Sequence, residues 1–318
     1  MTRKRPKGVL SVGWACFACA ATGRTEHVPT SEDYPDTVVR RFSFEAGGGL
    51  GWKLSAITTP RERRAPWKIV VVTGAPSWAE YWAPALAALP PDREMVVVDR
   101  PGYAGSEPVE YVGDIRVQAQ ALAPLLKGRP GQKVLLVGQS YGAAIATLMA
   151  EQNRGRVAGL VLLSGYFGES GPTARWLIGV GSKLLKIIPR DLRHAVIEVS
   201  NQPAQLDYLH AALRRIRIPV HVIHGDKDDF APIEIAERLV AETRTRRPIR
   251  FERVIGANHF LNDGPAEPLL TALEACIPPR RSFKLWLPKL PKVAWPRLGR
   301  AGRTSADHVS RGAGTSPA

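Results

Sequence analysis

A serine flanked by glycines near the middle of the chain constrains its fold and chemistry most strongly. Residues 138–142 read Gly-Gln-Ser-Tyr-Gly, and they follow the apolar run 134–137 and precede small and apolar residues at 143–149. This order predicts a strand, a sharp turn and a helix, with Ser140 in strained backbone geometry above the edge of a sheet. The N-terminus of the helix would offer free N–H groups to a developing oxyanion.

A serine hydroxyl is a weak nucleophile at neutral pH, so it needs a base nearby and a third group to orient that base. Two later strands supply candidates. A polar loop with Asp226, Asp228 and Asp229 follows the buried run 220–225, and His259 follows the strand predicted at 249–254. Loops at the carboxyl ends of strands converge at one edge of a doubly wound sheet. The order serine, aspartate, histidine is the one expected with this kind of turn.

At these residues the chain resembles the α/β-hydrolase family, from about residue 38 to residue 277. Four segments carry the resemblance in the order and spacing of the family: residues 96–106, 138–142, 225–232 and 256–260. The resemblance implies an α/β fold with a mostly parallel, doubly wound sheet and an inserted helical lid.

The resemblance also implies the roles of individual residues. Ser140 is expected to be the nucleophile, His259 the base and Asp228 the acid. Asp226 and Asp229 are the nearest competitors for the acid, and we interpret both as solvated loop carboxylates.

Two backbone N–H groups are expected to form the oxyanion hole, those of Tyr141 and Ala75. Pro76 follows Ala75 and has no N–H to donate. The family usually has His-Gly where this chain has Thr73 and Gly74. Because the donor is a backbone group, this departure concerns the packing of the loop more than the mechanism.

The implied function is cleavage of a carboxylic ester or similar small-molecule acyl substrate by a serine hydrolase. One alternative is an acyltransferase or perhydrolase that uses the same triad with an acceptor other than water. The other is a non-catalytic ligand-binding protein on the same scaffold, which a degraded triad would favour. No cofactor or metal is expected, because the chain shows no metal-ligand cluster and the glycines at 47–51 lack phosphate-loop or dinucleotide spacing.

We expect a hydrolase domain over residues 35–278 with a lid at about 165–218, where the alternation of strands and helices stops. Apolar residues recur there at helical spacing, and they either pack the lid on the core or form a wall for an acyl chain: Trp176, Leu177, Ile178, Leu184, Leu185, Ile187 and Ile188. Elsewhere the sequence predicts strands at 37–44, 52–58, 68–72, 95–99, 133–137, 159–163, 221–224 and 249–254. Helices are predicted at 78–88, 114–126, 140–151, 233–241 and 265–276.

The net charge of +15 is concentrated at the two ends of the chain. Residues 1–8 carry four basic residues and residues 279–318 carry nine against one aspartate, which leaves +3 elsewhere. A nearly neutral body argues against a partner that is a nucleic acid. The tail at 279–318 is rich in proline and is expected to be disordered; weak contact with a membrane surface is the alternative.

Residues 1–20 are predicted to be a signal peptide, because basic residues precede a short apolar stretch and Ala18 and Ala20 resemble a cleavage site. The stretch is too short to span a bilayer. Export to the periplasm or secretion is therefore expected. Lipidation of Cys19 is a weaker alternative, because Cys16 stands where an aliphatic residue is expected. A cytoplasmic location follows if the segment is not a signal.

Overall fold

The computed structural model of the chain describes residues 29–61, 65–243, 248–262 and 266–277. The segments expected to be a signal peptide, 1–20, and a basic tail, 279–318, lie outside these residues. A short 3-10 turn, η1 (Ser31–Asp33), precedes the region predicted to be the hydrolase domain. Within the described ranges, no helix has the length and hydropathy needed to cross a membrane.

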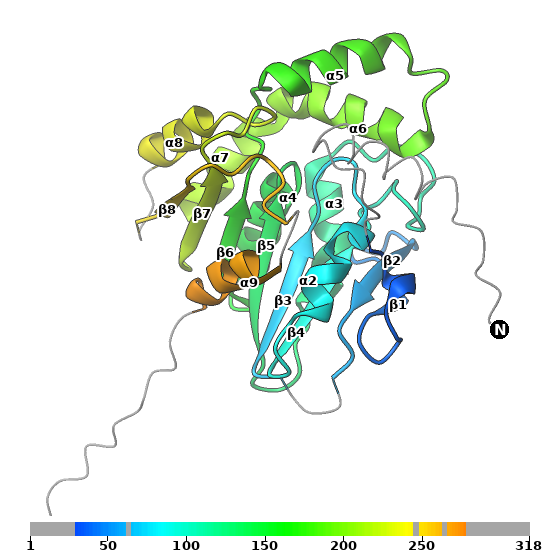
Figure 1. Cartoon of the computed structure of the whole chain (residues 1–318), viewed down its shortest axis with the longest axis vertical. Helices are drawn as coiled ribbons and strands as arrows, with labels where there is room; N and C mark the ends of the chain where they lie inside the picture. The colour runs from blue at the N-terminus through cyan, green and yellow to red at the C-terminus, as the bar shows by residue number, and fades with distance from the viewer. Residues whose placement is uncertain (1–28, 62–64, 244–247, 263–265, 278–318) are drawn as a thin grey trace, which may run out of the picture. The chain divides into compact units, whose positions relative to one another are not determined.

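An eight-stranded sheet forms the centre of the fold (Figure 1). Its strands lie side by side in the order β1-β2-β4-β3-β5-β6-β7-β8. Strand β2 pairs antiparallel with β1 and β4, and the other neighbouring pairs are parallel. The strands are β1 (Arg40–Glu45), β2 (Lys53–Thr58), β3 (Trp67–Val72), β4 (Arg93–Val98), β5 (Lys133–Gln139), β6 (Val157–Leu163), β7 (Val220–Gly225) and β8 (Arg250–Val254). The predicted fold class, α/β with a mostly parallel sheet, is correct.

The order of the strands reverses at β3. The chain passes from β3 to β4 on one side and then returns to β5 on the other side of β3. In a doubly wound sheet, ligands bind outside the carboxyl ends of the strands at such a reversal. The loops after β3 and β5 therefore flank the expected position of a site.

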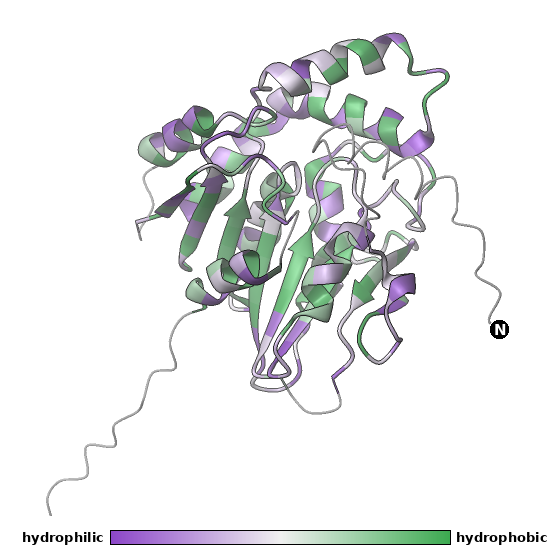
Figure 2. Ribbon diagram, in the orientation of Figure 1, coloured by the Kyte–Doolittle hydropathy of each residue, from purple (hydrophilic) through white to green (hydrophobic). Residues whose placement is uncertain are grey.

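The central strands are buried on both faces, which explains their continuous apolar sequences. All six residues of β3 are buried, as are the last six of β5. The edge strand β1 has no fully buried residue. Figure 2 shows the hydrophobic colour concentrated on the central strands. Parallel strands covered by helices on both faces have this pattern, because neither face of the sheet meets water.

Helices cover both faces of the sheet and make the fold three-layered (Figure 1). One face packs against α3 (Ile115–Leu122), α4 (Gly142–Gln152), α7 (Leu206–Arg215) and α8 (Ile233–Glu242). The other face packs against α2 (Ala83–Ala87), the 3-10 turn η2 (Ala79–Trp82) and α9 (Ala266–Ala275). Two separate apolar clusters result, one on each side of the sheet.

Two helices are shorter than the sequence predicted, and each is interrupted at a proline. The predicted helix 78–88 is the 3-10 turn η2 followed by α2, with Pro84 in the first turn of α2. The predicted helix 114–126 is α3 followed by a 3-10 turn, η3 (Ala123–Leu126), with Pro124 in its first turn. Proline lacks an N–H and its ring clashes with the preceding helical turn, so it begins a new turn rather than continuing the old one.

The segment predicted as a lid is helical and lies between β6 and β7. It contains α5 (Pro172–Lys183), α6 (Arg190–Asn201), a 3-10 turn, η4 (Gln202–Gln205), and α7. Helices α5 and α6 pack on each other beyond the carboxyl ends of the strands (Figure 1). Helix α7 instead packs on α4 within the core.

Candidate active site

Ser140 lies in the sharp turn between β5 and α4. Its φ of 50° falls in the left-handed region, which is strained for a residue with a Cβ. Two glycines make the turn possible. A Cβ on Gly138 would lie 2.7 Å from the Cα of Ala143, and a Cβ on Gly142 would lie 2.3 Å from the carbonyl oxygen of Val72. The local sequence therefore has no alternative to glycine at either position.

The structure brings Ser140, His259 and Asp228 together. His259 Nε2 lies 3.0 Å from Ser140 Oγ, and His259 Nδ1 lies 2.8 Å from Asp228 Oδ2. The serine follows β5, the aspartate follows β7 and the histidine follows β8. These side chains form a continuous hydrogen-bonded chain from a buried carboxylate to the hydroxyl.

The carboxylate of Asp228 is held in place by several donors. Its Oδ1 accepts backbone N–H groups from Phe230 at 3.0 Å and Ala231 at 2.8 Å. Burial raises the pKa of this carboxyl, but the charge of His259 and hydrogen bonds to the carboxylate outweigh burial and hold the pKa well below its usual range. The group therefore remains ionised and accepts a hydrogen bond from the imidazole Nδ1–H.

The neighbouring carboxylates face other partners. Asp226 accepts the N–H of Gly256 at 2.6 Å. Asp229 accepts a hydrogen bond from the hydroxyl of Thr173 at the start of α5. In the part of the chain that the structure describes, His259 makes its carboxylate hydrogen bond to Asp228 and to neither of these two.

His224 is a neighbour of the site whose contact with Asp228 the sequence did not reveal. It is fully buried at the end of β7, and its Nε2 lies 2.7 Å from the carbonyl oxygen of Ala231 and 3.1 Å from Asp228 Oδ2. It thus approaches the same carboxylate oxygen as His259. A histidine in a buried strand carries no sequence signal that distinguishes this contact from ordinary packing.

The two predicted oxyanion donors lie beside Ser140. Ala75 follows β3 and lines the pocket above the serine. Tyr141 directly follows the serine, and its ring is buried against the Arg100 guanidinium at 5.0 Å. Within the described ranges, no hydrogen bond is donated by the backbone N–H of Ala75 or Tyr141. Of the two residues, Ala75 is the one that lines the pocket.

Thr73, which replaces the usual histidine, is part of the packing beneath this loop. Its hydroxyl lies 2.5 Å from Ser77 Oγ and donates to the carbonyl of Val98 at 3.1 Å. The Thr73 hydroxyl, where the chain departs from the family pattern, therefore has hydrogen-bond partners of its own.

A pocket of about 70 Å³ opens above Ser140. Phe230 stacks on the imidazole of His259, with ring centroids 5.3 Å apart and planes 19° apart. The described residues that line the pocket are Thr73, Gly74, Ala75, Pro76, Trp78, Tyr81, Gln139, Ser140, Tyr166, Ala174, Val199, Phe230, His259 and Phe260. None of these is Asp, Glu, Lys or Arg. The pocket is thus small and aromatic, and its described lining holds no acidic side chain, lysine or arginine.

Two of the seven apolar residues singled out in the helical segment meet neither expectation, whereas Leu177, Ile178, Leu185 and Ile188 are partly buried. Trp176 is 66% exposed and Ile187 is 77% exposed, so neither packs on the core nor lines the pocket. The residues that reach the pocket from α5 and α6 are the small Ala174 and Val199. Helical spacing identified apolar positions, but the rotation of α5 about its axis decides which of them face inward.

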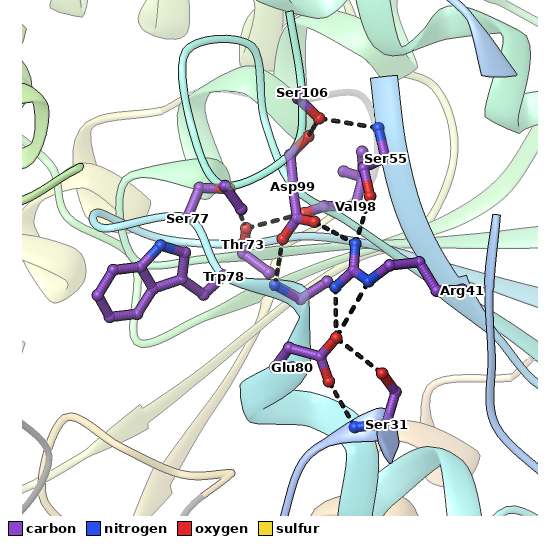
Figure 3. Close-up of polar contacts among 12 residues, drawn as sticks. Ser31, Arg41, Ser55, Thr73, Ser77, Trp78, Glu80, Val98, Asp99 and Ser106 are labelled. Atoms are coloured by element: carbon purple, nitrogen blue, oxygen red, sulfur yellow. Dashed lines mark hydrogen bonds and ion pairs between the residues drawn. The ribbon is translucent and has the colours of Figure 1, made fainter. Parts of the chain in front are cut away.

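The loop after β4, part of the segment that supported the family resemblance, carries a buried charge network (Figure 3). Asp99 accepts the N–H of Ala79 at 2.7 Å and Arg41 Nη1 at 2.6 Å. Burial raises the pKa of Asp99 against the opposing effect of Arg41. Arg41 also pairs with Glu80. The network joins β1 to η2 and to the residue that follows β4.

Arg100 is fully buried and pairs with Glu198 of α6 at 2.7 Å. Nothing in the sequence predicts this pair, because the spacing of residues 100 and 198 gives no sign that they meet. No group of three or more His, Cys, Asp or Glu able to hold a metal occurs in the part of the chain that the structure describes.

The fold and this site define the class of the protein. The chain belongs to the α/β hydrolase family, whose model matches residues 69–272.

Among curated proteins, the chain is 25% identical over 220 residues to a 2-hydroxy-6-oxononadienedioate/2-hydroxy-6-oxononatrienedioate hydrolase of Paraburkholderia xenovorans strain LB400, covering 57% of this chain and 75% of that protein. It is 30% identical over 104 residues to Protein PHYLLO, chloroplastic, of Arabidopsis thaliana, covering 30% of this chain but 6% of that protein. Among solved structures, a thermophilic esterase from Thermogutta terrifontis superposes with a TM-score of 0.57 at 19% identity, covering 74% of this chain and 97% of that one. This last likeness shows the shared fold.

Proposed function

We propose that the protein is a serine hydrolase that cleaves small, uncharged carboxylic esters. The observation that carries the proposal is the continuous chain Asp228–His259–Ser140, with distances of 2.8 Å and 3.0 Å. A nucleophile, a base and an orienting acid in mutual hydrogen-bonding reach are the parts that acyl transfer through a serine requires.

In the proposed reaction, Ser140 Oγ attacks the ester carbonyl while His259 Nε2 removes the hydroxyl proton. Asp228 stabilises the imidazolium that forms. The N–H groups of Ala75 and Tyr141 bind the oxygen that becomes negatively charged. Collapse of this intermediate expels the alcohol, which takes the proton from His259, and leaves an acyl group on the serine. Water then attacks the acyl-enzyme, with His259 acting again as base, and releases the carboxylic acid.

The pocket favours an uncharged ester over the substrate of the Paraburkholderia relative. That relative is named for 2-hydroxy-6-oxononadienedioate, which by its chemical name is a dicarboxylate. The described lining of this pocket holds no Lys or Arg to pair with a second carboxylate. Burying an unpaired carboxylate is costly. The nearby Arg100 does not change this balance, because Glu198 already neutralises it.

The test is a series of p-nitrophenyl esters from acetate to decanoate, with 2-hydroxy-6-oxononadienedioate as the charged comparison. We expect the highest kcat/KM for the shortest chains, because the pocket holds only about 70 Å³. Ser140→Ala is the matched control and should be inactive. Cleavage of the dienedioate without ester hydrolysis would refute the substrate class, and no turnover of any ester would favour a non-catalytic protein.

Water as the acceptor is a separate part of the proposal. Product analysis of the same reaction with added methanol or hydrogen peroxide separates hydrolysis from acyl transfer. Free acid as the main product supports hydrolysis, whereas a methyl ester or peracid as the main product would make the protein an acyltransferase or perhydrolase.

A further inference from the structure

Arg100 is fully buried, and every N–H group of its guanidinium donates a hydrogen bond. Its Nε donates to the carbonyl oxygen of Thr73 at 2.9 Å, and its Nη2 donates to that of Gly74 at 2.7 Å. The remaining N–H groups donate to Gln118 Oε1 at 2.7 Å and to both carboxylate oxygens of Glu198, each at 2.7 Å. The side chain thus links the loop after β3 to helix α6.

Glu198 accepts hydrogen bonds from Arg100 and from two further side chains. Its carboxylate, also fully buried, accepts Gln118 Nε2 at 2.9 Å and the hydroxyl of Tyr103 at 2.5 Å besides the two bonds from Arg100. A two-pronged pair of this kind fixes the plane of the guanidinium as well as its position. The orientation of Arg100 therefore depends on α6, which belongs to the helical segment and not to the sheet.

The Gly74 carbonyl that Arg100 binds belongs to the same peptide unit as the N–H of Ala75. Among the described residues the cis peptides are those before Pro76 and Pro108, so the unit between Gly74 and Ala75 is trans. In a trans unit the C=O and the N–H point in opposite directions. Because Arg100 holds the Gly74 carbonyl, the N–H of Ala75 points away from Arg100. Ala75 itself lines the pocket.

The loop also has little freedom on its other side. A Cβ on Gly74 would lie 2.9 Å from the Cβ of Ser140, so the backbone passes close to the nucleophile. A charged donor on a carbonyl also polarises the peptide and strengthens its N–H as a donor. The same contact thus orients and activates the N–H assigned to the oxyanion.

We propose that Arg100, oriented by Glu198, is a positioning residue for the oxyanion hole, and that the seating of α6 sets the geometry of that hole. This inference rests on the proposed function. It connects the helical segment to the chemical step by a path that avoids the substrate pocket.

The test compares two arginine-to-lysine variants. Arg100→Lys keeps the charge opposite Glu198 but has three donors in place of five, so it cannot hold both carbonyls and the carboxylate together. Arg41→Lys is the matched control, because Arg41 also pairs with a buried carboxylate, Asp99, but makes no hydrogen bond to the loop after β3. Both are measured in the full chain with p-nitrophenyl acetate.

We expect Arg100→Lys to lower kcat by about 10- to 100-fold with KM changed less than about twofold, because an oxyanion donor acts in the transition state and its complete loss costs about 10²–10³. Arg41→Lys should keep kcat within about twofold. A trifluoromethyl ketone, which forms an oxyanion on the serine, should lose affinity for Arg100→Lys in proportion to kcat. A structural role alone would lower the Tm without moving this affinity.

An unchanged kcat in folded Arg100→Lys, or an equal loss in Arg41→Lys, would overturn the inference. If Arg100→Lys does not fold, Glu198→Gln replaces it, with an expected loss in kcat of about 3- to 10-fold; an unchanged kcat there would overturn the inference as well. Wild-type protein with no esterase activity, or active Ser140→Ala, would instead refute the proposed function itself.

Discussion

The loops at the strand ends and the helical segment between β6 and β7 both surround the pocket, but they contribute in different ways. The loops supply the groups with chemical reactivity, and each is fixed by its place directly after a strand. The helical segment supplies Ala174 and Val199 to the pocket and Glu198 to a buried pair, while its large apolar residues Trp176 and Ile187 face outward. The position of a side chain at a strand end is set by the sheet. The position of a side chain on a helix is set only when the helix packs against the rest of the protein.

The largest effect is expected at the serine. Ser140→Ala should lower kcat by about 10⁶-fold while leaving the fold intact, since a triad nucleophile commonly contributes that much. The measurement is steady-state hydrolysis of p-nitrophenyl acetate together with the Tm. A folded Ser140→Ala protein with near wild-type activity would place the chemistry outside the strand-end loops.

The loop after β7 allows two neighbouring carboxylates, Asp228 and Asp229, to be compared. Asp228→Asn should lower kcat by about 10⁴-fold, because an amide no longer stabilises the imidazolium or fixes its tautomer. Asp229→Asn is the matched control, since Asp229 binds Thr173 of the helical segment and not His259. A larger loss at Asp229 than at Asp228 would contradict the geometry of the site.

Acid should weaken the fold through the same carboxylate. The pKa of Asp228 is lowered in the folded state, so its ionised form stabilises the protein above the unfolded value of about 3.9. That contribution is lost as the pH falls through and below this value toward the folded pKa. We therefore expect the Tm difference between wild type and Asp228→Asn to decrease between pH 6 and pH 3. A difference independent of pH would show that Asp228 makes no ionic contribution to stability.

The smallest effect is expected within the helical segment. Trp176→Ala should change the free energy of unfolding by less than about 0.5 kcal/mol, because the side chain is 66% exposed. Leu209→Ala, at a fully buried position of α7, should cost about 2–5 kcal/mol and serves as the contrast. Urea denaturation measures both. Equal destabilisation by the two variants would mean that α5 packs as tightly as α7.

Much of the fold could be predicted from the sequence, because strands buried on both faces have short apolar sequences that lie between turn residues. Ser140 and Asp228 follow such runs. His259 follows β8, which has no fully buried residue, so its assignment depended on the resemblance of residues 256–260 to the family. The contact of His224 with Asp228 did not follow, because a histidine in a buried strand has no distinguishing neighbours. The pair of Arg100 and Glu198 joins segments far apart in the chain, and only the docking of α6 brings them together.

The central claim is that Ser140 is an activated nucleophile in a site assembled from three strand ends. The most direct measurement is labelling of the full chain with a fluorophosphonate, followed by peptide mass spectrometry. We expect one adduct per chain, on Ser140, and no adduct in His259→Ala within the same time. Absence of labelling in folded wild-type protein, or an adduct on another residue, would contradict it.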